Sequence, residues 1–138
     1  MYEELDKYLS GFFTDDYWYD EGFDIATEML QDFNQNDWDK LLTDIFSKSI
    51  EWQIRYAYCA DSDINDEIIV KSLILLCSID NNELFEKCID SLRVIVNEDT
   101  IEIISNNKTL IEKVEKIIPK CGAASKKMFE DFITKIII

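Results

Sequence analysis

Apolar residues recur along this chain at intervals of three and four positions, the spacing that brings side chains to one face of an α-helix. Glycine occurs three times and proline once in 138 residues, so little interrupts that pattern. We therefore expect an all-α protein. The periodicity predicts about eight to nine helices, over residues 2–9, 23–33, 37–47, 50–60, 66–79, 82–96, 99–104, 108–118 and 125–137.

Two of these predicted helices carry unusually apolar surfaces. Residues 66–79 are apolar around most of the helical circumference, which is typical of a helix buried between neighbours. The last predicted helix has one apolar face, which can either pack within the protein or meet a second chain. This face holds Phe129, Phe132, Ile133 and Ile136. The sequence favours a monomer and leaves the oligomeric state open.

Residues 12–22 depart from the helical pattern. They mix aromatic side chains with carboxylates and show no helical period. We expect an irregular acidic and aromatic segment within a single helical domain that spans residues 1–138. Its aromatic side chains can either cover the end of the helical layers or anchor a protein partner, a role to which Tyr and Trp are suited.

A weak internal repeat relates two parts of the chain at an offset of 31 residues. Leu42, Ile45, Phe46, Ile54, Ala57 and Ala60 fall on Leu73, Leu76, Cys77, Phe85, Cys88 and Ser91. These pairs match in size and polarity, without identity. A period of about 30 to 45 residues is typical of stacked helical hairpins. It predicts an α-solenoid of antiparallel hairpins, and a compact bundle with a coincidental offset is the alternative.

The charge is strongly acidic and unevenly distributed. Acidic residues outnumber basic ones by 29 to 14, for a formal net charge of −15. Residues 1–69 hold 18 acidic and 4 basic side chains, against 11 and 10 in the remainder. Such a surface repels phosphate backbones, which argues against direct nucleic-acid binding. Because self-repulsion does not help folding, we expect the acidic half to bind a basic protein; a surface that only aids solubility is the alternative.

The candidate binding residues lie in two acidic stretches. In the first, carboxylates alternate with aromatic side chains. The second runs from the loop after the helix predicted over 50–60 into the start of the helix predicted over 66–79, and it would extend the acidic field along one side of stacked hairpins. The set is Asp15, Asp16, Tyr17, Trp18, Tyr19, Asp20, Glu21, Asp24, Asp61, Asp63, Asp66 and Glu67.

The sequence offers little for catalysis. Histidine, the commonest general base and metal ligand, is absent. No glycine-rich phosphate loop or nucleophile motif occurs, and the acidic residues near 61–66 lack the glycine of a calcium loop. The cysteines are spaced too widely for a metal-binding pair, and we expect reduced thiols at Cys59, Cys77, Cys88 and Cys121. We predict no enzyme activity, no metal and no cofactor.

The N-terminal residues are acidic, whereas a signal peptide begins with a basic region. The longest apolar runs fall far short of the roughly 20 residues of a membrane helix. We therefore expect a cytoplasmic protein that does not bind membranes.

The stretch Trp38-Asp39-x-Leu41-Leu42, followed by Glu51-Trp52-Gln53-Ile54-Arg55-x-Ala57, resembles a HEAT-type helical hairpin. Residues 73–92 continue the resemblance, although Glu86 stands where an arginine is expected. Arg55 is expected to pair with a carboxylate of a neighbouring helix, and a place in an interface is its alternative role. Small acidic proteins with this arrangement are similar to the α-helical immunity proteins of bacterial contact-dependent growth inhibition and related polymorphic toxin systems.

The resemblance covers residues 36–97. It implies a cytoplasmic protein that neutralises a cognate toxin domain by covering its active site. Toxin domains of this kind are often nucleases with basic clefts, which an acidic inhibitor would complement. A HEAT-like scaffold that holds two host proteins together is the alternative function.

Overall fold

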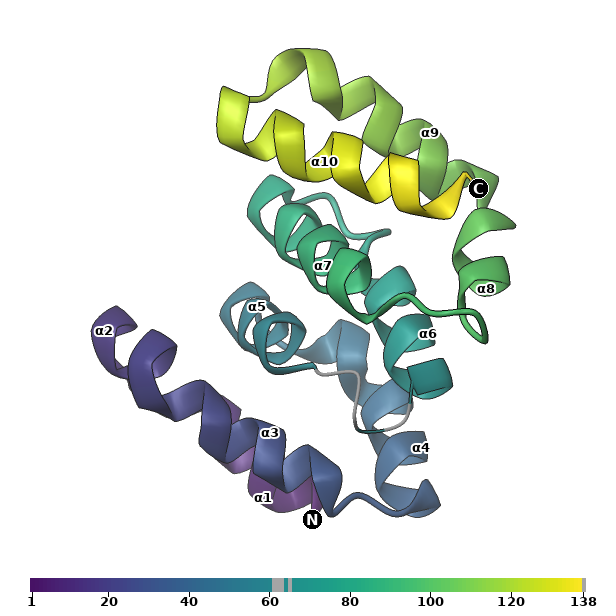
Figure 1. Ribbon diagram of the computed structural model, residues 1–138. Helices are drawn as coiled ribbons and strands as arrows, with labels where there is room; N and C mark the ends of the chain where they lie inside the picture. The colour runs from purple at the N-terminus through teal and green to yellow at the C-terminus, as the bar shows by residue number, and fades with distance from the viewer. Residues whose placement is uncertain (61–63, 65, 138) are drawn as a thin grey trace.

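The computed structural model describes residues 1–60, 64 and 66–137, with the backbone alone at Asp66. Over these residues all regular secondary structure is helical, which confirms the all-α prediction for the described chain (Figure 1). The α-helices are α1 (Tyr2–Leu9), α2 (Asp15–Tyr17), α3 (Phe23–Gln31), α4 (Gln35–Asp44), α5 (Ile50–Cys59), α6 (Asp66–Leu76), α7 (Asn82–Ile95), α8 (Ile101–Ser105), α9 (Lys108–Ile117) and α10 (Ala123–Ile136). A π-helical turn (Trp18–Gly22) joins α2 to α3, and 3₁₀ turns follow α4 (Ile45–Ser47) and α9 (Ile118–Lys120).

Side-chain caps fix the starts of several helices. Ser49 accepts a hydrogen bond from the Trp52 N–H at 3.2 Å, and Asn81 accepts one from the Leu84 N–H at 2.9 Å. Helix α4 begins earlier than predicted, because Asn34 and Asp37 form a reciprocal capping box there.

The prediction of an irregular segment over residues 12–22 is wrong for most of its length. Residues 11–14 are non-helical, but Thr14 caps α2, and α2, the π turn and α3 form one helical run from Asp15 to Gln31. Gly22 lies inside this run. A Cβ atom at Gly22 would lie 3.0 Å from Cε3 of Trp18, so this glycine makes room for the indole ring and does not end a helix.

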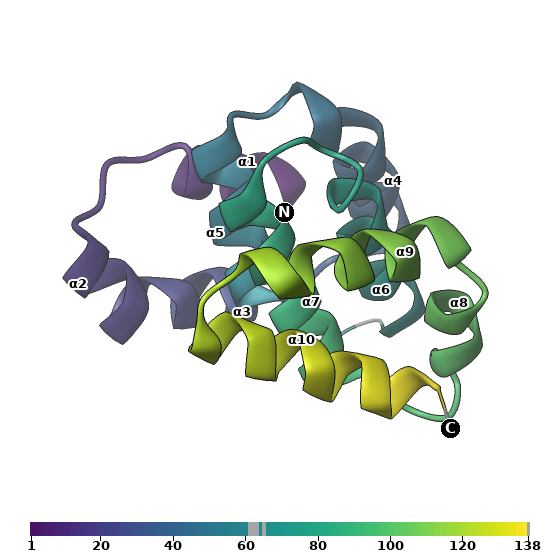
Figure 2. The same cartoon turned by 90° about the horizontal axis from the view of Figure 1, so that it is seen from above.

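The helices lie in a row of successive layers. Helices α3, α5, α7 and α10 pack side by side in that order, and on the other side of the row α1 contacts α4, the turn after α4 contacts α6, and α6 contacts α8 (Figure 1). The first layer (α1–α3) therefore lies at the opposite end of the row from α9 and α10. Seen from above, α2 projects beyond the other helices (Figure 2).

The core runs through all of these layers. Its largest fully buried side chains are Trp52, Tyr56, Phe85, Phe129 and Phe132. The apolar face of α10 thus packs within the protein. Helix α6 is less enclosed than predicted, because Leu75 remains 37% exposed. No helix in the described ranges is both long and apolar enough to cross a membrane.

Candidate protein-binding surface

The first layer carries most of the negative charge. Residues 1–33 contain ten acidic side chains and one lysine, a difference of −9. Five of these acids recur at every fourth position, four within the α2–α3 run and the last at the residue that follows it. All five are exposed, and we call them the acidic stripe. The acidic stripe consists of Asp16, Asp20, Asp24, Glu28 and Asp32. Like charges at this spacing repel one another, so the stripe does not stabilise the helix that carries it.

The acidic residues predicted for this segment are available to a partner. Asp15 and Glu21 are exposed, as the stripe is. Over the described residues, none of the carboxylates between Asp15 and Asp24 takes part in an ion pair. Their charge is therefore not neutralised within the protein.

The three aromatic residues among the candidate binding residues divide into one core residue and two surface residues. Trp18 is 4% exposed and packs in the core, which agrees with the alternative role expected of these aromatic side chains, that of covering the end of the helical layers. It lies on the face of the run that also buries Gly22 and Leu30. Tyr17 and Tyr19 are 37% and 38% exposed and remain available for contact.

The second predicted acidic stretch contributes less. Asp61, Asp63 and the side chain of Asp66 lie outside what the structure describes. Glu67 is exposed and pairs with Lys71 at 2.8 Å, which lowers the pKa of Glu67. This carboxylate is therefore already neutralised by a cation of its own helix.

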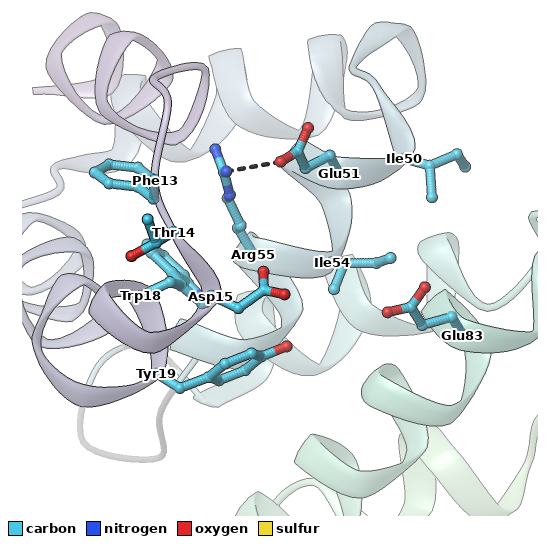
Figure 3. A pocket seen from close by; sticks show the side chains of 10 residues that line it. All are labelled: Phe13, Thr14, Asp15, Trp18, Tyr19, Ile50, Glu51, Ile54, Arg55 and Glu83. Atoms are coloured by element: carbon cyan, nitrogen blue, oxygen red, sulfur yellow. Dashed lines mark hydrogen bonds and ion pairs between the residues drawn. The ribbon is translucent and has the colours of Figure 1, made fainter.

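A groove forms where the α2–π segment faces the N-terminal ends of α5 and α7 (Figure 3). We call it the α2–α5–α7 groove, and its volume is about 240 Å³. It is lined by Phe13, Thr14, Asp15, Trp18, Tyr19, Ile50, Glu51, Ile54, Arg55 and Glu83. Of the predicted site residues, it brings together Asp15, Trp18 and Tyr19, while the acidic stripe lies outside it.

Arg55 fixes one wall of this groove. Its Nη1 donates to the carbonyl oxygens of Leu9 at 2.8 Å and Gly11 at 2.7 Å, and its Nη2 donates to Glu51 Oε1 at 2.7 Å. The guanidinium also lies 4.8 Å from the Phe13 ring centroid. Arg55 is thus a structural residue, as expected, but its carboxylate partner is on its own helix, and it holds the α1–α2 connection against α5.

The groove is electrostatically negative. Its lining holds the carboxylates of Asp15, Glu51 and Glu83 against the single cation of Arg55, which leaves −2. Burial raises the pKa of the Tyr19 phenol, and the charges of Asp15 and Glu83 raise it further. These two carboxylates from distant parts of the chain therefore act on the same side chain.

Sequence reasoning did not identify Glu83 as a site residue, although a signal exists. Glu51 and Glu83 each occupy the second position after a capping residue, Ser49 and Asn81. Carboxylates are favoured in the first turn of a helix, so each looks ordinary by itself. Only the side-by-side packing of α5 and α7 brings them to the same groove.

Two buried cysteines carry thiols with raised pKa values. Among the described residues, no three His, Cys, Asp or Glu side chains are placed to hold a metal ion. Burial raises the pKa of Cys59, and the neighbouring Cys77 thiol together with burial raises the pKa of Cys88. These thiols are therefore held in the protonated form, which is a poor nucleophile.

Comparisons of the chain with models of protein families, with curated proteins and with solved structures find no match.

Proposed function

We propose that this protein is an immunity protein, which binds a cognate, basic, nuclease-type toxin domain in the cytoplasm and covers its active site. The observation that carries the proposal is the acidic stripe on α2–α3, whose exposed carboxylates have no ion-pair partners among the described residues. Unneutralised surface charge raises the association rate with a partner of opposite charge, whereas its repulsion destabilises the fold. The toxin class itself comes from the resemblance of residues 36–97.

We further propose that the helices form a HEAT-like stack in which α4–α5 and α6–α7 are successive hairpins. Helices α4 and α6 begin at Gln35 and Asp66, 31 positions apart, and helices α5 and α7 begin at Ile50 and Asn82, 32 positions apart. These spacings agree with the offset in the sequence. A stack of this kind would hold α2–α3 as a rigid end layer, with its outer surface free for a partner.

Co-expression tests the immunity function directly. The C-terminal domain encoded immediately upstream in the source genome is expressed in a bacterial host with and without this protein. Growth arrest by that domain, relieved by this protein in a co-purifying complex, supports the proposal. A harmless upstream domain, or a toxic one that this protein neither binds nor neutralises, contradicts it. Stable capture of two host proteins at moderate salt would instead support the scaffold function.

Stopped-flow kinetics with that toxin domain tests the role of the acidic stripe. The variant Asp16→Asn/Asp20→Asn/Asp24→Asn removes three carboxylates from the first layer. We expect its association rate at low salt to fall about tenfold, and the difference to shrink as salt screens the field.

A matched variant distinguishes the effect of where the removed charges lie from the effect of the change in net charge. Glu98→Gln/Asp99→Asn/Glu102→Gln removes three exposed carboxylates near α8 and changes the net charge equally. Its association rate should stay close to that of the unmodified protein. Equal losses in both triple variants would mean that only total charge matters, and would contradict the assignment to α2–α3.

A further inference from the structure

We infer that the α2–α5–α7 groove is a receptor for one arginine side chain of the partner protein. This inference rests on the proposed function for the identity of the partner, and it names the group that the protein recognises. Three independent properties of the groove carry it: its size, its walls and its unpaired acceptors.

The size of the groove suits one side chain. Its volume of about 240 Å³ lies below the range of drug-sized ligand sites, which begins near 300 Å³. The walls are aromatic and aliphatic, with Phe13 and Tyr19 on the α2 side and Ile50 and Ile54 on α5. Such walls suit the methylene stem of a long basic side chain and the flat face of a guanidinium.

The carboxylates at the opening of the groove are not engaged in ion pairs within the described chain. The carboxylates of Asp15 and Glu83 and the phenol of Tyr19 point toward the same opening from opposite sides (Figure 3). Across the described chain, neither Asp15 nor Glu83 lies in an ion pair. The one cation of the lining, Arg55, is engaged by Glu51 and two backbone carbonyls. A second cation, Lys87, lies beside the lining, with its Nζ 5.2 Å from the Tyr19 ring centroid, but it forms no ion pair with Asp15 or Glu83 among the described residues. The groove therefore presents two carboxylates that no cation of the described chain pairs with.

A guanidinium fits this set of groups better than an ammonium. It carries five N–H donors in a plane and can donate to carboxylates on two sides while its face lies against an aromatic ring. A lysine ammonium has its charge on a single nitrogen, so it donates less well to carboxylates on two sides. Arg55 holds the α1–α2 connection against α5, so this side of the groove is fixed before a guest binds, which lowers the entropic cost of binding.

The α1–α2 connection, which contributes Phe13 to the groove, also carries an exposed aromatic side chain. Phe12 is 96% exposed and directly precedes Phe13, which lines the groove. An exposed aromatic next to an acidic groove is typical of a protein-binding surface, in which an apolar contact accompanies a charged one. This favours a side chain presented by a protein over a free small cation as the natural guest.

Nuclear magnetic resonance titration of the full chain with acetyl-arginine-amide tests the inference without a toxin. We expect chemical-shift changes centred on Asp15, Tyr19 and Glu83, with a dissociation constant of about 1 to 10 mM. Acetyl-lysine-amide should bind more weakly, and acetyl-glutamine-amide should produce no changes at these residues. Equal binding of the arginine and lysine probes, shifts spread over the acidic stripe, or no shifts at the groove would each overturn the inference.

Two matched variants sharpen the test. Glu83 and Glu102 are both exposed glutamates at the second position of a helix, in α7 and α8. Glu83→Gln should weaken binding of acetyl-arginine-amide about fivefold, whereas Glu102→Gln should leave it unchanged. Thermal melts of both variants confirm that each is folded. Equal affinities for the two variants would overturn the assignment of Glu83.

The same variants distinguish this inference from the proposed function. If the upstream domain is no toxin and acetyl-arginine-amide still binds at the groove, the immunity proposal fails and the arginine site remains. If the toxin domain binds Glu83→Gln as tightly as the unmodified protein, immunity remains and the partner's arginine does not occupy the groove. About fivefold weaker toxin binding by Glu83→Gln alone supports both.

Discussion

The two ends of the helical row contain the same number of acidic residues but differ greatly in bases. Residues 1–33 hold ten acidic side chains and one basic, and residues 82–137 hold ten acidic and nine basic. At the second end a group of charges is paired internally: Arg93 contacts Asp90 at 2.5 Å and Asp131 at 3.1 Å, and Lys135 contacts Asp131 at 3.6 Å. At the first end the acidic stripe has no such partners among the described residues.

This difference separates two uses of a carboxylate. The paired acids at the α7–α10 end neutralise cations of the same chain, so their charge is used within the protein. At the other end, Glu3 and Asp6 of α1 pair with Lys40 and Lys48. The unpaired acids of the acidic stripe repel one another, and their negative charge remains available to attract another molecule. The scarcity of bases, more than the number of acids, therefore marks the candidate binding surface.

The largest effect is expected from removing the one arginine that holds the first layer. Arg55→Met leaves the Leu9 and Gly11 carbonyls without their donor, and we expect a loss of about 3 kcal/mol in the free energy of unfolding. The same substitution at the partly exposed Arg93 should cost less than about 1 kcal/mol. Urea unfolding measures both. Equal losses would mean that Arg55 has no special structural role.

A smaller loss is expected from filling the space that Gly22 leaves. Its Cβ position is 3.0 Å from Trp18 and 3.2 Å from Tyr17, so Gly22→Val should destabilise by about 2 kcal/mol and alter the emission of Trp18. Gly122, at the start of α10, has no atom within 4 Å of its Cβ position. Gly122→Val is therefore the control, and a loss as large as that of Gly22→Val would refute the packing explanation.

Asp37 lies in the acidic half, and its carboxylate accepts hydrogen bonds from backbone N–H groups. The backbone N–H of Asn34 lowers the pKa of Asp37, and the N–H of Tyr2 contributes, despite the opposing effect of burial. The ionised carboxylate therefore stabilises the fold above its ordinary pKa near 4, and this stabilisation disappears as the pH falls through the lowered pKa.

We expect Asp37→Asn to cost about 1 kcal/mol at neutral pH and progressively less in acid. Urea unfolding as a function of pH measures the difference. Asp99→Asn, at an exposed residue, is the control and should follow the unmodified protein at every pH. A loss for Asp37→Asn that stays constant down to the most acidic pH would contradict this role.

The smallest effect should have the opposite sign. Neutralising Asp16, Asp20 and Asp24 removes like-charge repulsion of about 0.3 kcal/mol per pair, so the triple asparagine variant should be slightly more stable at low salt. The gain should vanish at high salt. Asp90→Asn/Asp131→Asn, which breaks ion pairs at the other end, should instead be neutral or slightly destabilised. Destabilisation of the triple variant would show that the stripe serves the fold.

Local features of the structure could be predicted well from the sequence. Ser49 and Asn81 begin helices because their side chains accept backbone N–H groups, a property that needs only a few neighbouring residues. The shared apolar face of Phe129 and Phe132 likewise followed from their helical spacing. That this face packs within the chain, and not against a second chain, is shown by the structure.

The helical structure of residues 15–22, which carry much of the candidate site, was not predicted, and the reason lies in the local sequence. Trp18, Gly22, Ala26 and Leu30 form a buried series at four-residue spacing, but a glycine between aspartates and aromatics resembles a break. Its function as a space for the Trp18 ring is visible only once the ring is placed. The π turn at this point also departs from the period on which helix prediction depends.

The groove itself could not be predicted, because it depends on packing between helices. Asp15 and Glu83 are 68 positions apart and meet only because α3, α5 and α7 are neighbours in the row. The charge asymmetry was predicted from the sequence. Its assignment to an end layer and a groove required the structure.

The unequal supply of bases along the row also gives the molecule an electric dipole, with its negative pole at α1–α3. In the field of a basic partner, a dipole experiences a torque as well as an attraction. The protein would therefore rotate its α2 end toward the partner while the two are still separated by water. A larger share of random collisions would then begin in the productive orientation, before Phe12 or the groove touches anything.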